Sequence, residues 1–505
     1  MIRSLQWALA LTGLCAVTAQ AAEARDLVVG VQEVRARFDP GMETGNTAFP
    51  LTNAMFDTLI RRDFKSDERG TGTELKPGLA ESWQRVDELT LELKLREGLS
   101  FHNGEALTSE DVKFSFDRML DPDSRYSRSR FQFGNIDRVE TVDDLTVRII
   151  TKTPDPVIEK MLFFPGASIV PKDYYQEVGF EAFGQNPIGT GPYVFVRSID
   201  DDRTILAANE DYWMGRPPVD QLVFREIPEI SARITALANG EVGLINNVPP
   251  DQLSAIERLS CCDVKSVMVN SHVLNYRTSN PIMADKRFRQ GLNLAIDREL
   301  LSRALWNGKA VVPRGHQYEE WGKLYNAERP VLAHDPERAR KLIAELGYAG
   351  QPIQFITHPV YYTNGLPAAE AIVSMWQDVG VNAELQVSEN WYKISNDEAD
   401  IEVRNLSDWL VVPDPHATIV WSWTVTALWE GNEDFQTLGK KAAATLDANE
   451  RYRLYQQMQD IWIEEAPGTV LYRAPEFYGV RNNIIWTPYS VYLMDFRPDN
   501  LSFKD

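Results

Sequence analysis

The chain has 505 residues, of which 44% are hydrophobic and 25% are charged, so a large folded core is expected and disorder is excluded. Its 73 acidic and 52 basic side chains give a formal net charge of −21, which disfavours nucleic acids and anionic membranes as partners. The six histidines include no pair at the i, i+3 or i, i+4 spacing, so the sequence predicts no helix-borne metal site.

Residues 1–22 have the pattern of a secretory signal peptide. Arg3 precedes an apolar run over 7–17, and Ala19-Gln20-Ala21 places small residues at the positions that a signal peptidase reads. The run is too short to cross a membrane, which needs about 20 apolar residues. We therefore predict that the protein is exported to the periplasm and that residues 1–22 are removed.

The rest of the chain alternates predicted strands with predicted helices. Helix 335–346 is the clearest, because Asp335 can cap it, Pro336 suits its first turn and Gly347 suits its end. This alternation indicates an α/β protein, and no Ser- or Gly-rich linker divides it, so we expect lobes between which the chain crosses repeatedly. In chain order, strands are predicted at 26–31, 89–96, 222–227, 353–357 and 400–409, and helices at 108–118, 231–239, 335–346 and 368–379.

Motifs of catalysis are missing from the sequence. It contains no Gly-x-Ser-x-Gly elbow, no Walker phosphate loop and no His-Glu-x-x-His pair. We therefore predict a protein that is not an enzyme and needs no cofactor or metal. An exported hydrolase that uses a pair of carboxylates stays open as an alternative.

A series of motifs in the first 300 residues resembles a known family. Leu75-Lys-Pro-Gly-Leu-Ala-Glu-Ser-Trp83 is followed by Leu93 to Gly104 and Leu107 to Phe116, and then by Asn186-Pro-Ile-Gly-Thr-Gly-Pro-Tyr193 and Phe288 to Arg298. In this order they closely resemble the extracellular solute-binding proteins of the dipeptide, oligopeptide and nickel class. The resemblance extends from about residue 26 to residue 500.

The resemblance implies a two-lobed periplasmic-binding-protein fold of type II, in which the lobes close like a venus flytrap, with an extra subdomain on lobe I. It further implies a monomeric receptor that delivers a small molecule or peptide to the inner-membrane permease of an ABC importer. The implied division is lobe I over 26–60, 187–270 and 476–505, the extra subdomain over 61–186, and lobe II over 271–475.

The cargo depends on the segment 388–423, where the family places its ligand contacts in lobe II. In peptide-binding relatives, a Trp is followed three residues later by an aspartate that holds the peptide ammonium group, but here Trp409 is followed by Val412. A buried ammonium without a partner is costly, so Asp408 or Asp414 is a candidate to replace that aspartate. Peptides remain the leading prediction, and an opine, an oligosaccharide or a metal chelate is the alternative.

Seven residues follow as predicted ligand contacts. Arg404 is either a clamp for a carboxylate or phosphate or an outward-facing charge. Trp409 and Tyr392 offer aromatic faces, and His416 follows Asp414 with a spacing similar to that of the nickel-binding branch. By resemblance, the opposite wall comes from the loop 44–49 and from residues 126–131. The predicted set is Asn46, Tyr126, Tyr392, Arg404, Trp409, Asp414 and His416.

Overall fold

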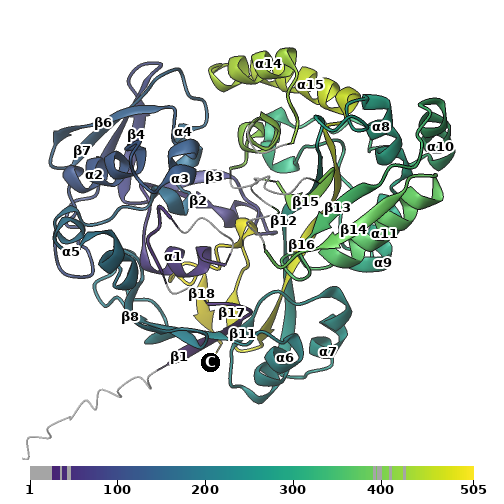
Figure 1. Cartoon of the computed structure of the whole chain (residues 1–505). Helices are drawn as coiled ribbons and strands as arrows, with labels where there is room; N and C mark the ends of the chain where they lie inside the picture. The colour runs from purple at the N-terminus through teal and green to yellow at the C-terminus, as the bar shows by residue number, and fades with distance from the viewer. Residues whose placement is uncertain are drawn as a thin grey trace, which may run out of the picture.

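The computed structural model describes residues 25–34, 37–42, 47–390, 394, 401–408, 412–424 and 428–504. Ten strands of these residues form one mixed sheet that runs through both lobes (Figure 1). Its order is β14 (Ala383–Val387), β13 (Ile353–Thr357), β15 (Val403–Ser407), β12 (Cys262–Tyr276), β16 (Gly468–Arg481), β11 (Leu244–Ile245), β1 (Asp26–Val31), β10 (Gln221–Glu226), β9 (Arg203–Ala208) and β8 (Tyr193–Ile199).

The two long strands β12 and β16 join the lobes. They pair antiparallel from Cys262 opposite Arg481 to Asn275 opposite Gly468, with a register shift between Met268 and Ser271. Lobe I extends the sheet on one side through β11, β1, β10, β9 and β8, and lobe II on the other through β15, β13 and β14. The predicted lobe boundaries at 270/271 and 475/476 lie inside these two strands, close to the shift, and the complete division stays a prediction.

A separate four-stranded sheet forms the extra subdomain, drawn in blue on the left of Figure 1. Its buried side chains form one apolar core, which also includes Val412, Ala417 and Trp421 of lobe II. The subdomain and lobe II therefore share a packed interface. The sheet has the order β4 (Ala80–Arg85), β5 (Thr90–Leu95), β7 (Thr146–Thr151) and β6 (Ile136–Asp143), with helices α2 (Ser109–Leu120), α3 (Ser127–Gln132), α4 (Ile158–Met161) and α5 (Lys172–Gln185).

The remaining helices pack on the central sheet or connect its strands. In lobe I they are α1 (Phe49–Met55), α6 (Ile230–Asn239) and α7 (Leu253–Glu257), and in lobe II α8 (Lys286–Ala295), α9 (Arg298–Trp306), α10 (Pro336–Glu345), α11 (Gly365–Asp378), α13 (Ser422–Thr424), α14 (Glu433–Ala443) and α15 (Ala448–Glu465). The π-helix η5 (His416–Trp421) precedes α13. Short strand pairs are β2 (Ile60–Asp63) with β3 (Glu74–Pro77), and β17 (Ile484–Trp486) with β18 (Leu501–Phe503).

Short 3₁₀ turns complete the described elements. They are η1 (Phe64–Ser66), η2 (Pro165–Ala167), η3 (Pro250–Gln252), η4 (Glu319–Leu324) and η6 (Ser490–Tyr492).

Local chemistry explains why the predicted elements form where they do. The Asp335 side chain accepts the N–H of Arg338 at the start of α10, and Thr108 and Asp111 form a capping box at the start of α2. Gly240 ends α6 in the left-handed region, where a residue without Cβ is favoured. The predicted strands and helices are confirmed, with ends that agree within three residues.

Candidate functional site

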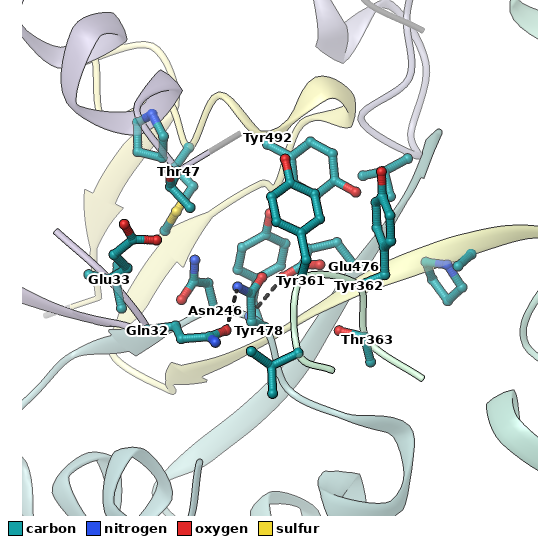
Figure 2. A pocket seen from close by; sticks show the side chains of 18 of the residues that line it. Gln32, Glu33, Thr47, Asn246, Tyr361, Tyr362, Thr363, Glu476, Tyr478 and Tyr492 are labelled. Atoms are coloured by element: carbon teal, nitrogen blue, oxygen red, sulfur yellow. Dashed lines mark hydrogen bonds between the residues drawn. The ribbon is translucent and has the colours of Figure 1, made fainter. Parts of the chain in front are cut away.

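A cavity of about 380 Å³ lies where the two lobes meet (Figure 2). We call it the interlobe cavity. This volume falls within the range of sites for small molecules. Lobe I contributes Val31, Gln32, Glu33, Thr47, Pro50, Leu51, Phe224, Asn246, Asn247, Tyr492 and Met494; lobe II contributes Trp306, His358, Val360, Tyr361, Tyr362, Thr363 and Glu389; and the strands β12 and β16, which the lobes share, contribute Val269, His272, Ala474, Pro475, Glu476 and Tyr478.

Parallel strands position the lobe I wall. β1 pairs in parallel with both β10 and β11, so the carboxyl ends of these strands meet at one edge of the sheet. Gln32 and Glu33 follow β1 at that edge, and Asn246 and Asn247 follow β11. The Asn247 Nδ2 donates to Gln32 Oε1 at 3.5 Å, which links the two segments. Such an edge is where open α/β sheets bind ligands.

Glu476 is the buried acid of the cavity. Its side chain projects from β16, and Oε1 accepts the backbone N–H of Asn247 at 2.7 Å. Burial raises the pKa of Glu476 to about 7, although the Asn247 hydrogen bond and the Arg233 charge both lower it. Close to neutral pH this carboxyl therefore exchanges its proton readily, and a cationic group bound beside it would favour the ionised form.

The lobe II wall is aromatic. Tyr361 and Tyr362 lie opposite Glu33 across the cavity in Figure 2. Behind them, the His272 ring packs 5.0 Å from the Tyr362 ring and 6.1 Å from the Trp306 ring. Burial lowers the pKa of His272 to about 4, so this imidazole is neutral at physiological pH. The wall therefore offers planar surfaces and a neutral imidazole to a ligand, with Glu389 as its carboxyl group.

Three predicted contacts, Asn46, Tyr392 and Trp409, lie outside the described residues. Arg404 is 2% exposed, and its Nη1 donates to the backbone carbonyl of Ile394 at 3.3 Å, so the outward-facing alternative is wrong and the clamp stays a prediction. Tyr126 is buried too, where its hydroxyl accepts from Arg118 at 2.6 Å and donates to Asp39 at 2.8 Å.

Asp414 and His416 lie at the contact between lobe II and the extra subdomain. Asp414 is fully buried, accepts hydrogen bonds from both Nη atoms of Arg451 at 2.6 and 3.1 Å, and lies 3.3 Å from Nζ of Lys160. The Asp408 carboxylate is also buried, bonded to His316 and Tyr318. Neither aspartate is among the described residues that line the interlobe cavity, and the two serve as buried hydrogen-bond acceptors elsewhere in lobe II.

Lys160 of the extra subdomain contacts Asp414 of lobe II, so replacing it tests whether this contact holds the subdomain on lobe II. Replacing it in Lys160→Met removes a half-buried cation, and we expect a loss of about 1 kcal/mol in the stability of the interface. Hydrogen exchange should then accelerate at residues 412–421 and stay unchanged in α15. Unaltered exchange at 412–421 would show that Lys160 does not hold the two bodies together.

Sequence reasoning missed Glu33, Asn247 and Glu476. Glu33 carried a usable signal, because it follows a predicted strand at the position where parallel sheets bind ligands. Glu476 carried none, because its place in the cavity depends on the pairing of β16 with β12, about 200 residues earlier in the chain.

The fold and the cavity define a two-lobed solute-binding receptor. A family model described as "Bacterial extracellular solute-binding proteins, family 5 Middle" matches residues 74–428. The chain belongs to this family, whose members serve as receptors of ABC importers. The resemblance, the fold class and the receptor function predicted from the sequence are thereby confirmed.

Three similar proteins illustrate the match. The di/tripeptide-binding protein 4 of Pseudomonas aeruginosa is 30% identical, with 96% of each chain covered. The dipeptide-binding protein of Escherichia coli is 27% identical, with 94% of each chain covered. The solved structure of DppA from Helicobacter pylori in complex with the peptide STSA has a TM-score of 0.83 at 23% identity, covering 95% of this chain and 98% of that one.

Cargo varies among the neighbours, whose printed names also include heme, agropinic acid and a nickel–histidine complex. Among the residues that the structure describes, no cluster of three or more His, Cys, Asp or Glu side chains is placed to hold a metal ion. Within the same residues, no helix combines the length and the apolar character that a membrane span requires.

Proposed function

We propose that this receptor binds a peptide-sized molecule with a protonated amine in the interlobe cavity. The observation that carries the proposal is the position of Glu33 and Glu476, two carboxyl groups that line one cavity from lobe I and from the shared strand β16. Carboxylates are the preferred partners of an ammonium group. The curated relatives named for di- and tripeptides favour a peptide over other amines.

Val412, which stands where peptide-binding relatives have an aspartate, supports the same proposal. Val412 is 1% exposed and packs into the apolar core of the extra subdomain, so this position offers no charge to a ligand. An ammonium group in the cleft therefore needs a carboxylate from elsewhere, and Glu33 and Glu476 supply one. The receptor would then keep an amine-bearing cargo while holding it from the lobe I side.

Transport follows from the relative motion of the lobes. Cargo that contacts both walls of the interlobe cavity favours the closed arrangement, and β12 and β16 act as the hinge that permits closure. The closed receptor docks on the permease of an ABC importer and releases the cargo chemically unchanged. In this proposal the protein is a periplasmic monomer, exported by residues 1–22, with no enzymatic activity.

The test compares free and blocked amines. Mass spectrometry of molecules released by denaturing the purified protein, together with a panel of dipeptides, identifies the tightest-binding cargo. Titration calorimetry should then show that N-acetylation of that cargo weakens binding by at least about 10-fold, because a charge-assisted hydrogen bond is lost. We expect Glu33→Gln to weaken the free amine to a similar extent and to leave the acetylated form nearly unaffected.

Glu88→Gln is the matched control, because Glu88 is exposed on the extra subdomain, away from the interlobe cavity. It should bind the cargo like the parent. Equal affinity of the parent for free and acetylated cargo would contradict the proposed amine site. Chemical turnover of the cargo would instead show that the protein is an enzyme.

A further inference from the structure

A second, smaller cavity of about 140 Å³ lies between the extra subdomain and lobe II. We call it the subdomain cavity. Its walls come from α3, β6, α4 and the turns beside them in the subdomain, and from η5 in lobe II. The lining residues are Phe131, Gln132, Phe133, Asn135, Ile136, Asp155, Val157, Ile158, Met161, His416 and Trp421. It shares no lining residue with the interlobe cavity.

Gln132 is the unusual residue of this cavity. Its side chain is 6% exposed, and neither the Nε2 nor the Oε1 atom has a hydrogen-bond partner among the described residues. The buried Nδ1 atom of His416 has none either. A buried polar group without a hydrogen-bond partner is destabilising, so a donor and an acceptor side by side without partners point to a missing occupant.

The surroundings of Gln132 restrict the charge of such an occupant. Both Asp155 carboxylate oxygens are engaged, one by the Val157 N–H at 2.9 Å and the other by Nδ2 of Asn135 at 2.9 Å. Burial lowers the pKa of His416, so its ring is neutral and cannot pair with an anion. An anionic group would thus meet the Asp155 charge in a cavity with no Lys or Arg among the described residues that line it, and a cation would have to share the Asp155 carboxylate with two hydrogen-bond donors.

Aromatic rings determine the shape of the occupant. The Trp421 ring lies 5.3 Å from the Phe131 ring and 5.3 Å from the His416 ring. The rings of each pair pack directly on one another, at interplanar angles of 57° and 68°, so together they form one aromatic wall on which a flat group can lie. A cavity of about 150 Å³ accommodates benzene, so this one has room for about five or six heavy atoms.

We propose that the subdomain cavity is a binding site for a small neutral carboxamide, whose C=O accepts from Gln132 Nε2 and whose N–H donates to Gln132 Oε1. The amide plane lies against Trp421, and His416 Nδ1 provides a further polar contact. Because the walls come from the extra subdomain and from lobe II, the bound amide contacts both of them. The site functions whatever cargo the interlobe cavity holds.

Propionamide is a suitable probe, because it has five heavy atoms and one primary amide. Saturation-transfer NMR on the full chain should give a saturable signal with a dissociation constant in the millimolar range, which is within reach of a ligand of five heavy atoms. We expect Gln132→Met, which conserves side-chain length, to weaken binding at least about 10-fold by removing both hydrogen bonds. Gln185→Met, at an exposed glutamine of α5, is the matched control and should bind like the parent.

Sodium propionate has the same size but carries a charge, and we expect it neither to bind nor to compete. A crystal of the parent soaked in propionamide provides a readout that does not depend on any variant, and it should show the amide paired with Gln132. Equal binding by Gln132→Met and the parent, equal binding of propionate, or only water in the soaked cavity would each overturn the proposal.

Discussion

Asp414→Asn is expected to lower the free energy of unfolding by about 3–5 kcal/mol, because it leaves the buried guanidinium of Arg451 without its carboxylate. Asp414 is 0% exposed and the Arg451 side chain is 5% exposed, so water cannot replace the lost partner. Chemical denaturation at neutral pH measures the loss. Arg451→Met in the Asp414→Asn background should recover part of it, because the unpaired charge is then gone.

Asp117→Asn is the control for this experiment, since Asp117 pairs with Lys113 and the two side chains are 46% and 39% exposed. We expect it to change stability little, as most surface ion pairs do. A loss no larger for Asp414→Asn than for Asp117→Asn would contradict the assigned role of Asp414.

The Asp414 effect also has a defined pH dependence. Burial alone would raise the pKa of Asp414, but Arg451 and Lys160 lower it below its ordinary value of 3.8. The stabilisation by the ionised carboxylate is therefore complete above the unfolded-state pKa and is lost as the pH falls through the lower folded-state pKa. The difference in the free energy of unfolding between the parent and Asp414→Asn should be largest at neutral pH. It should shrink as the pH falls below about 3.8, the ordinary pKa of the carboxyl.

Glu476→Gln is expected to stabilise the protein at alkaline pH. The pKa of Glu476 is about 7 in the folded chain and 4.5 ordinarily, so between these values the folded state holds a proton that the unfolded state has lost. Stability of the parent therefore falls as the pH rises from about 4.5 to 7, by about 3 kcal/mol in all at about 1.4 kcal/mol per pKa unit. Glutamine does not ionise, so the variant should be more stable than the parent at pH 8 and equal to it near pH 4.

Melting temperatures of the two proteins over this pH range provide the measurement. Parallel curves from pH 4 to pH 8 would show that Glu476 does not change its ionisation on folding. Cargo binding provides a second readout, because an amine bound at Glu476 requires the ionised form. Affinity of the parent should fall as the pH drops below 7, whereas the Gln variant should bind weakly with little pH dependence.

Asp414 and Glu476 are both buried acids, but the first stabilises the fold and the second is placed to bind a ligand. The Asp414 carboxylate has its hydrogen-bond partners within the protein, so its replacement lowers the free energy of unfolding. Glu476 receives the Asn247 N–H but lies in a cavity open to a ligand, so its charge is costly until a cation arrives. A site that binds an ammonium group through a buried carboxyl must tolerate this cost in the empty protein.

Local sequence determined the α/β class, the ends of helices such as α10 and the membership of a receptor family. Helix caps, glycines and alternating apolar residues act over a few positions, so they predict local structure from the sequence alone. Glu33 was accessible in principle by the same reasoning, because it follows the predicted strand that became β1.

Tertiary structure alone decided the roles of Asp414 and Glu476. Asp414, which the sequence suggested as a ligand contact, meets Lys160 from 254 residues earlier in the chain at a contact between two bodies. Glu476 reaches the cavity because β16 pairs with β12, which places it opposite Val267 from about 200 residues earlier in the chain. A carboxylate becomes a buried ion-pair partner or a ligand contact according to which distant segment covers it, and no local pattern encodes that choice.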